Sequence, residues 1–193
     1  MNENIRCFLA FDIENEEIIR KISSIQQSLL QRNIQLKIVK PENIHITMKF
    51  LGNISYNLMN KISNELKAID FNSFLVEFNG IGTFPNIHHP RVVWIGIKKG
   101  SIELIKIFNQ IESLLHKLGF KQDFREFSPH LTIARVKTAK NKEQLINFTK
   151  SKASINIGTM RIKYLKLKKS DLTPNGPIYT TIKKFSSKSE GEK

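Results

Sequence analysis

The sequence has little cysteine, few acidic residues and no long apolar run. Cys7 is its single cysteine, so an internal disulfide is excluded and a cysteine-based zinc site is not expected. No apolar stretch approaches the roughly 18 residues of a membrane-spanning helix. The short apolar run near the start is broken by Asp12 and Glu14, which argues against a secretory signal peptide. These absences predict a protein of a reducing cytoplasm that does not associate with a membrane.

The shortage of acidic residues leaves the chain strongly basic. Its 193 residues include 31 Lys and Arg against 17 Asp and Glu, a formal net charge of +14. A basic surface attracts polyanions such as nucleic acid, although Lys-rich surfaces also serve solubility alone. Hydrophobic residues make up 40% of the chain, which argues against disorder and suffices for a core. We predict one domain over residues 1–185 and a disordered tail over residues 186–193, where apolar anchors are missing.

The order of the expected elements predicts an α+β fold. Apolar residues recur at helical spacing in four segments, residues 15–32, 56–69, 101–118 and 141–150. Strands are expected at residues 5–13, 36–39, 44–51, 74–78, 92–97, 130–136, 160–167 and 178–185. Several strand pairs have short connections, which favours antiparallel sheets. The Gly- and Pro-rich segment 80–90 is interpreted as a turn, and it does not carry the spacing of a dinucleotide-binding loop.

One short pattern, His-apolar-Thr-apolar, occurs twice on expected strands. The copies are His45–Met48 and His130–Ile133. Alternate residues of a strand share a face, so each His projects together with the Thr two positions later, while the apolar residues face the core. If the two strands lie side by side or face each other, one cleft receives two imidazoles and two hydroxyls.

Such a set suits chemistry at a phosphodiester. A neutral imidazole can take a proton from the attacking oxygen, and a protonated one can give a proton to the leaving oxygen. The hydroxyls of Thr47 and Thr132 can bond the non-bridging oxygens, where charge develops. Arg135 lies five residues after His130, so a straight strand would place it on the opposite face. It would reach phosphate only where the strand twists or ends.

The remaining histidines fit ordinary structural roles. His88 and His89 lie in the expected turn, and His116 lies near a helix C-terminus, where a cation is favourable. No pair has the spacing of a metal-binding motif, and neither repeat contains a carboxylate. A metal site that uses His45 and His130 is an alternative, but we expect neither metal nor cofactor.

Around these residues the sequence resembles the two-histidine phosphoesterase superfamily. Within it, the sequence is most similar to the RNA 2',3'-cyclic phosphodiesterases, also called 2'-5' RNA ligases. The resemblance rests on six segments, Arg6–Asp12, Pro41–Gly52, Gly80–Asn86, Arg91–Ile97, Ser128–Val136 and Leu172–Tyr179. It implies two pseudo-symmetric lobes with antiparallel sheets and flanking helices around a central cleft. It also implies metal-independent opening of an RNA 2',3'-cyclic phosphate to a 2'-phosphomonoester, with ligation as a secondary reverse reaction.

The resemblance further implies a role for each site residue. His45 corresponds to the proton donor for the departing 3'-oxygen and His130 to the proton acceptor that activates water. Thr47, Thr132 and Arg135 correspond to phosphate-binding positions. Phe50 corresponds to an aromatic position near the nucleobase, although alternation from His45 would instead direct it into the core. The residue pattern by itself predicts the pair of histidines without assigning donor and acceptor.

Two alternatives to this function remain open at the level of sequence. The same site could act on another cyclic or 2'-5' nucleotide, because superfamily members use ADP-ribose cyclic phosphate, 2'-5' oligoadenylates or terminal uridines of small RNA. The chain could also be a basic RNA-binding module without turnover, with a stripe formed by Lys163, Lys166, Lys168 and Lys169. The intact motifs favour the enzyme. The predicted partner is RNA with a 2',3'-cyclic phosphate end, bound by a monomer.

Overall fold

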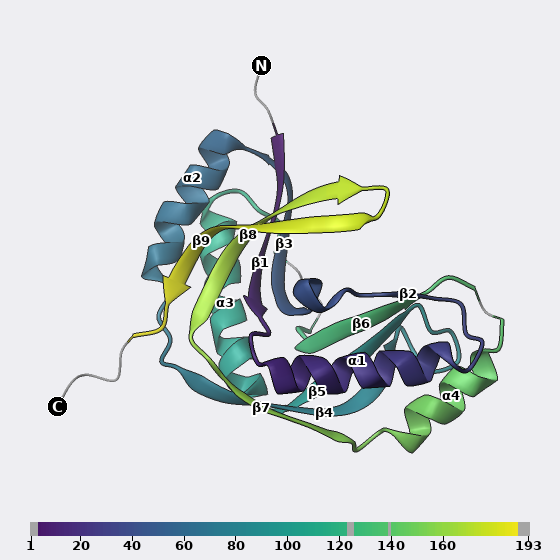
Figure 1. Cartoon of the computed structure of the whole chain (residues 1–193). Helices are drawn as coiled ribbons and strands as arrows, with labels where there is room; N and C mark the ends of the chain where they lie inside the picture. The colour runs from purple at the N-terminus through teal and green to yellow at the C-terminus, as the bar shows by residue number, and fades with distance from the viewer. Residues whose placement is uncertain (1–3, 123–125, 139, 189–193) are drawn as a thin grey trace.

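The computed structural model describes residues 4–122, 126–138 and 140–188. Its helices are α1 (Glu16–Leu30), α2 (Tyr56–Glu65), α3 (Ser101–Lys117) and α4 (Lys142–Ser151), with 3₁₀ turns at Pro41–Asn43 and Leu66–Ala68 (Figure 1). Its strands are β1 (Asn4–Asp12), β2 (Leu36–Ile38), β3 (His45–Ser55), β4 (Phe74–Phe84), β5 (Val92–Lys99), β6 (His130–Val136), β7 (Asn156–Ile162), β8 (Tyr164–Thr173) and β9 (Gly176–Ser186). Within these ranges, no helix has the length and apolar character to cross a membrane.

The strands form an antiparallel sheet that is divided near its middle. The strand order is β7-β4-β5-β6-β3-β1-β8-β9, and β2 also pairs with β6. Most neighbours pair over several residues, whereas β3 and β6 meet through one residue pair, Ile46 with Leu131. The sheet therefore has two lobes, one built on β4–β7 with β2 and the other on β1, β3, β8 and β9. They join where the two repeated motifs begin.

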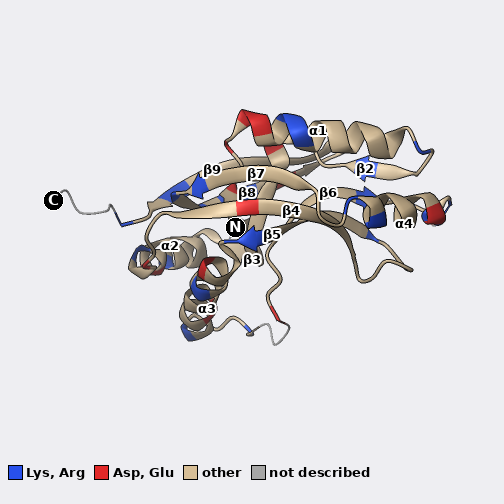
Figure 2. Ribbon diagram, turned by 90° about the horizontal axis from the view of Figure 1, so that it is seen from below, with Lys and Arg blue, Asp and Glu red and all other residues tan. Residues whose placement is uncertain are grey.

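Helices cover both faces of this sheet. Figure 2 shows α1 on one side of the strands and α2 and α3 on the other, and α1 contacts β6 and β7 while α3 contacts β3 and β5. The apolar face of α1 is buried, as its spacing predicts. Asn15 caps this helix by accepting from the Ile18 amide at 3.0 Å, and Ser55 caps α2 by accepting from Leu58 at 3.2 Å. The buried apolar residues of both lobes form one continuous core.

The segment 80–84, expected to be part of a turn, is instead the end of strand β4. The expected strand 74–78 continues through Gly80-Ile81-Gly82-Thr83 to Phe84 and pairs with β5 from Glu77 to its end. Gly82 belongs there because the ring of Trp94 lies against its backbone, and a Cβ at this position would overlap that ring. The turn follows at residues 85–91.

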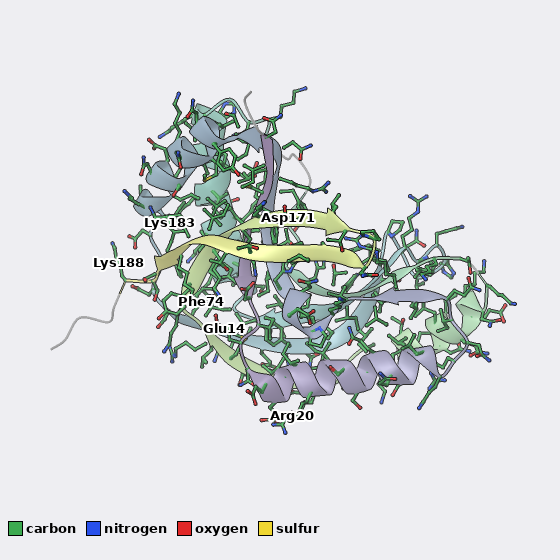
Figure 3. The ribbon with its side chains drawn as sticks, turned by 45° about the horizontal axis from the view of Figure 1, so that its top comes forward. Glu14, Arg20, Phe74, Asp171, Lys183 and Lys188 are labelled. Carbon is green, nitrogen blue, oxygen red and sulfur yellow. The ribbon has the colours of Figure 1, made fainter. Side chains whose placement is uncertain are left out.

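The C-terminal region also differs from expectation. The single strand expected over residues 160–167 is two strands, β7 and β8, with Lys163 between them. Residues 186–188 of the expected tail are held in place, because Ser186 ends β9 and the Lys188 amide donates to the Phe71 carbonyl at 2.9 Å. The Lys188 ammonium also pairs with Asp70 at 2.6 Å, just past the end of β9 (Figure 3). Residues 189–193 lie outside the described residues.

Candidate active site

A cleft of about 1090 Å³ lies where the two lobes meet. Both repeated motifs open onto it. The lining includes all six residues that the sequence analysis placed at the site, namely His45, Thr47, Phe50, His130, Thr132 and Arg135. The structure therefore brings together residues that are far apart in the chain.

The pairing of β3 with β6 relates the two motifs by an approximate twofold axis. Ile46 and Leu131 are partners, and both side chains are fully buried. Because the strands are antiparallel, the same register places His45 across from Thr132 and Thr47 across from His130. Each imidazole thus lies opposite the hydroxyl of the other motif, on the face that points away from the core.

A β-bulge in β3 places Phe50 on the same face as His45. Ala10 of β1 pairs with Thr47, but the next residue, Leu9, pairs with Lys49, so Met48 is an extra residue. The extra residue reverses the alternation that follows it. Phe50 consequently lines the cleft and is 62% exposed, which corrects the expectation that alternation directs it into the core.

A matching bulge in β6 does the same for Arg135. Ala134 pairs with Val93 and Thr132 with Trp94, so Ile133 is the extra residue and Arg135 returns to the face of His130. The straight-strand argument that placed Arg135 on the far face is wrong for this reason. The bulged carbonyl of Ile133 does not lack partners, because it accepts from the Val39 amide at 3.0 Å and from Gln26 Nε2 at 2.9 Å.

Both catalytic candidates have the same imidazole orientation. His45 Nδ1 lies 2.7 Å from the Asn43 carbonyl oxygen, and His130 Nδ1 lies 2.7 Å from the Ser128 carbonyl oxygen. A carbonyl oxygen can only accept, so each Nδ1 carries a hydrogen and donates it. The proton-exchanging atom of both residues is therefore Nε2, and each ring is held by the backbone two residues before it.

Aromatic side chains enclose the histidines. The ring of His45 packs against Phe8 at 5.1 Å and Tyr179 at 5.4 Å between centroids. The ring of His130 packs edge-on against Phe84 at 4.9 Å. No sequence motif indicates a role for these three aromatic residues, although each lies in a segment that carries the family resemblance. Their relation to the histidines depends on strand pairing, so composition and spacing gave no signal for it.

Burial changes the acid–base properties of both imidazoles. The pKa of His45 is lowered to about 4, mainly by burial and in part by the positive charge of Lys168, although the Asn43 carbonyl and Asp12 act in the opposite direction. Burial also lowers the pKa of His130, against the hydrogen bond to Ser128. Before substrate binds at neutral pH, both rings are therefore neutral and both Nε2 atoms are acceptors.

The four lysines considered as an RNA-binding stripe do not form a continuous exposed surface, because the middle two are buried. Lys166 and Lys168 are only 6% and 4% exposed. Lys168 bonds both oxygens of Asp12 at 2.6 and 2.7 Å, and Lys166 bonds Asp12 at 3.0 Å and Glu14 at 2.6 Å. Although burial raises the pKa of Asp12, these bonds outweigh it and the pKa is lowered. The two buried lysines are paired with the carboxylates of Asp12 and Glu14 and are not available to a nucleic acid.

The same ion pairs bear on the question of a metal. Asp12 is the strand partner of His45, so it is the carboxylate placed to complete a site with that imidazole. Its oxygens are already occupied by Lys166 and Lys168. Across the ranges that the structure describes, no group of three or more His, Cys, Asp or Glu side chains has a metal-binding arrangement.

Comparison with known proteins agrees with this geometry. The family model described as LigT like Phosphoesterase matches the chain twice, over residues 13–94 and 95–179, so each match contains one motif. The RNA 2',3'-cyclic phosphodiesterase of Methanocaldococcus jannaschii is 40% identical over 181 residues, which is 94% of this chain and 100% of the relative. The enzyme of the same name from Archaeoglobus fulgidus is 39% identical over 94% of this chain and 99% of its own.

Solved structures show the same fold. The crystal structure of E. coli LigT complexed with 3'-AMP aligns with a TM-score of 0.77 at 23% identity, over 97% of this chain and 100% of the other. The structure of TT0787 of Thermus thermophilus gives the same TM-score, identity and coverage. With two matched repeats, two paired motifs and this fold, the chain belongs to the LigT-like phosphoesterase family.

Proposed function

We propose that the protein hydrolyses the 2',3'-cyclic phosphodiester at an RNA end to a 2'-phosphomonoester, with His45 and His130 as the acid–base pair. The observation that carries the proposal is the pair of Nε2 atoms presented to one cleft, each ring fixed through Nδ1. The printed names of the relatives from M. jannaschii and A. fulgidus support the choice of substrate.

The proposed reaction is an in-line displacement at phosphorus. His130 Nε2 takes a proton from water while the water oxygen bonds to phosphorus. The bond between phosphorus and the 3'-oxygen breaks, and His45 Nε2 gives its proton to that oxygen. The products are a 2'-phosphate and a 3'-hydroxyl, and proton exchange with solvent restores both rings. The assignment of donor and acceptor follows the family resemblance.

Substrate binding allows His45 to take from solvent the proton that the acid needs. A pKa of about 4 leaves His45 neutral at neutral pH before substrate binds. A phosphodiester anion beside the ring favours the imidazolium form and raises this pKa. The complex therefore takes up a proton when it forms, and His45 becomes an acid only in the presence of the group it will protonate.

The other site residues have proposed roles in binding. The hydroxyls of Thr47 and Thr132 bond the non-bridging oxygens, where negative charge increases during the reaction. Arg135 adds a cation to the β6 side of the cleft, and Phe50 offers an exposed ring to a nucleobase on the β3 side. We also propose that the protein acts as a monomer and can catalyse the reverse 2'-5' ligation. A cytoplasmic location belongs to the same proposal, and the single cysteine, Cys7, supports it.

The test is a turnover assay in excess chelator. Substrates are a 2',3'-cyclic mononucleotide and an oligoribonucleotide with a 2',3'-cyclic phosphate end, and the products are identified by phosphorus NMR. We expect hydrolysis of both, with a 2'-phosphate product. A 3'-phosphate product would show that the proton-transfer roles are misassigned. RNA binding without turnover would favour the binding-module alternative and contradict the proposal.

A further inference from the structure

The cleft carries more basic side chains than the proposed reaction uses. Five basic residues line it, and Glu126 is the one acidic residue among the described lining. Lys49 is neutralised by Glu112 at 2.5 Å. Arg6, Lys37, Lys40 and Arg135 are exposed, and no carboxylate in the described part of the chain pairs with them. One reacting phosphate does not need four such cations.

Three of these cations form a row along β6, β2 and the residues that follow β2. Lys37 and Arg135 are partners in the antiparallel pairing of these strands, so their side chains project from the same face. That is the cleft face, because the bulge at Ile133 turns Arg135 toward it. Basic positions on β2 and β6 are neighbours in Figure 2.

The row begins next to the reacting groups. The Val39 amide donates to the Ile133 carbonyl at 3.0 Å, which places the following residue, Lys40, near the Thr132 end of β6. Arg135 and Lys37 lie further from His130 along the same two strands. The order from the reacting centre outward is therefore Lys40, then the pair of Arg135 and Lys37.

The opposite wall of the cleft presents exposed apolar side chains beside Arg6. Phe50 of β3 is 62% exposed, and Leu172, near the tip of the β8–β9 hairpin, is 69% exposed. Both line the cleft. Proteins that hold single-stranded nucleic acid combine a cationic groove for the backbone with apolar or aromatic platforms for the bases. The two walls supply these two components.

We propose that the RNA strand leaves the two-histidine centre along β2 and β6, with its upstream phosphates on Lys40, Arg135 and Lys37 and its bases toward Phe50 and Leu172. The inference rests on the proposed function. A 2',3'-cyclic phosphate ends the chain at its 3' side, so the nucleotides on this track are those 5' to the reacting one. A mononucleotide has no phosphate beyond the reacting one, and the track therefore selects RNA ends over free cyclic nucleotides.

The experiment compares Lys37→Gln/Lys40→Gln with the unmodified protein on two substrates. These are a 2',3'-cyclic mononucleotide and a tetraribonucleotide with a 2',3'-cyclic end. Each lost phosphate contact on a single strand should reduce the slope of log(kcat/KM) against log[salt] by about 0.7. We expect kcat/KM for the tetranucleotide to fall roughly fivefold to tenfold at low salt and its salt slope to flatten by about 1.4. Turnover of the mononucleotide should stay within about twofold.

The matched control is Lys61→Gln/Lys106→Gln on α2 and α3. It removes the same charge from exposed lysines that do not line the cleft. If this control lost as much kcat/KM on the tetranucleotide, the effect would be one of net charge, and the proposed track would be overturned. The track would also be overturned if the Lys37→Gln/Lys40→Gln variant lost kcat/KM equally on both substrates, or lost none. If the unmodified protein turns over neither substrate, the proposed function itself fails, which is a different result.

Discussion

Strands β3 and β6 carry the same four-residue motif and the same local geometry, yet the two sides of the cleft differ. In both strands the His ring is held by a carbonyl two residues earlier at 2.7 Å. In both, one bulged residue turns the fifth residue after the His into the cleft. That fifth residue is Phe50 on one side and Arg135 on the other.

The surroundings of the two imidazoles also differ. His45 is the strand partner of Asp12 and lies near the buried Lys168, whereas burial and a backbone carbonyl account for the pKa of His130. A duplicated scaffold thus presents two equivalent proton-exchanging atoms, and its neighbours make them inequivalent. The comparison teaches that strand pairing brings two similar imidazoles to one cleft and that the residues around them differ between the lobes. The predictions below test how far the equivalence extends.

Loss of either imidazole should have the largest effect. His45→Ala and His130→Ala each remove a proton-transfer group, which typically contributes a factor of roughly 10² to 10⁴ in rate. We expect both variants to lose kcat by amounts in that range, measured on the cyclic mononucleotide. His116→Ala, an exposed histidine in the last turn of α3, is the control and should retain full turnover. Substantial activity in either site variant would show that the two strands do not share the reaction.

Loss of a threonine hydroxyl should lower kcat less than loss of an imidazole, and by similar factors on the two strands. Thr47→Val and Thr132→Val keep the shape but remove the hydrogen bond to a non-bridging oxygen. Removing one such donor lowers kcat on the order of a hundredfold. Thr→Ser at the same positions should recover most of the rate, and Thr180→Val on the exposed face of β9 should have no effect. Valine variants with unchanged kcat would remove the threonines from the site.

Substitutions of the fifth residue after each histidine, Phe50 and Arg135, should have different effects on the two sides of the cleft. Phe50→Ala should raise KM roughly fivefold to tenfold with little change in kcat, because base stacking on an aromatic ring contributes about 1–3 kcal/mol. Arg135→Gln should lower kcat/KM roughly tenfold and reduce its salt dependence, because a charge-assisted contact is lost. The exchange variant Phe50→Arg/Arg135→Phe should not recover either loss. Recovery would mean that the two sides are interchangeable.

The smallest effect is on the pH dependence of stability. Burial lowers the pKa of His45 to about 4, against roughly 6.5 in an unfolded chain. Between these values the unfolded chain binds a proton that the folded protein excludes, so His45 makes the free energy of unfolding fall as pH falls from about 6.5 toward 4. Urea unfolding of the wild type and His45→Gln is measured at about pH 7 and pH 5. The free energy of unfolding should fall less between these pH values in the variant than in the wild type.

The control for this measurement is His116→Gln, which removes an exposed histidine of α3 that lies outside the cleft. His130 acts in the same direction as His45, so the His45 variant should retain part of the dependence. If the free energies of unfolding of the wild type and His45→Gln differed by the same amount at both pH values, the burial of a neutral imidazole would be contradicted.

Much of the fold could be predicted from local patterns. The amphipathic face of α1 and the caps Asn15 and Ser55 depend on interactions within a few residues, so the sequence contains their full cause. The segment 80–84 could not be predicted in the same way. Its glycines are typical of a turn, but Gly82 serves a strand because the Trp94 ring from a neighbouring strand lies against it. That reason exists only after β4 and β5 pair.

Lys166 and Lys168 illustrate the same limit for charge. In sequence they belong to a run of lysines on a strand, which is typical of a solvent-exposed or nucleic-acid-binding face. Whether a lysine meets solvent or a carboxylate depends on what the adjacent strand carries. Here β1 ends at Asp12, whose carboxylate binds both ammonium groups, and the Glu14 carboxylate binds that of Lys166 as well.

The sequence by itself determined which groups can do chemistry, because two His-x-Thr repeats on strands specify two imidazoles and two hydroxyls that face away from a core. The tertiary structure decided where the fifth residues point. One extra residue in each strand, Met48 and Ile133, reverses the alternation, and these bulges are defined only against the partner strands β1 and β5. Phe50 and Arg135 reach the cleft for that reason, and they place an aromatic ring on one side of the two histidines and a cation on the other.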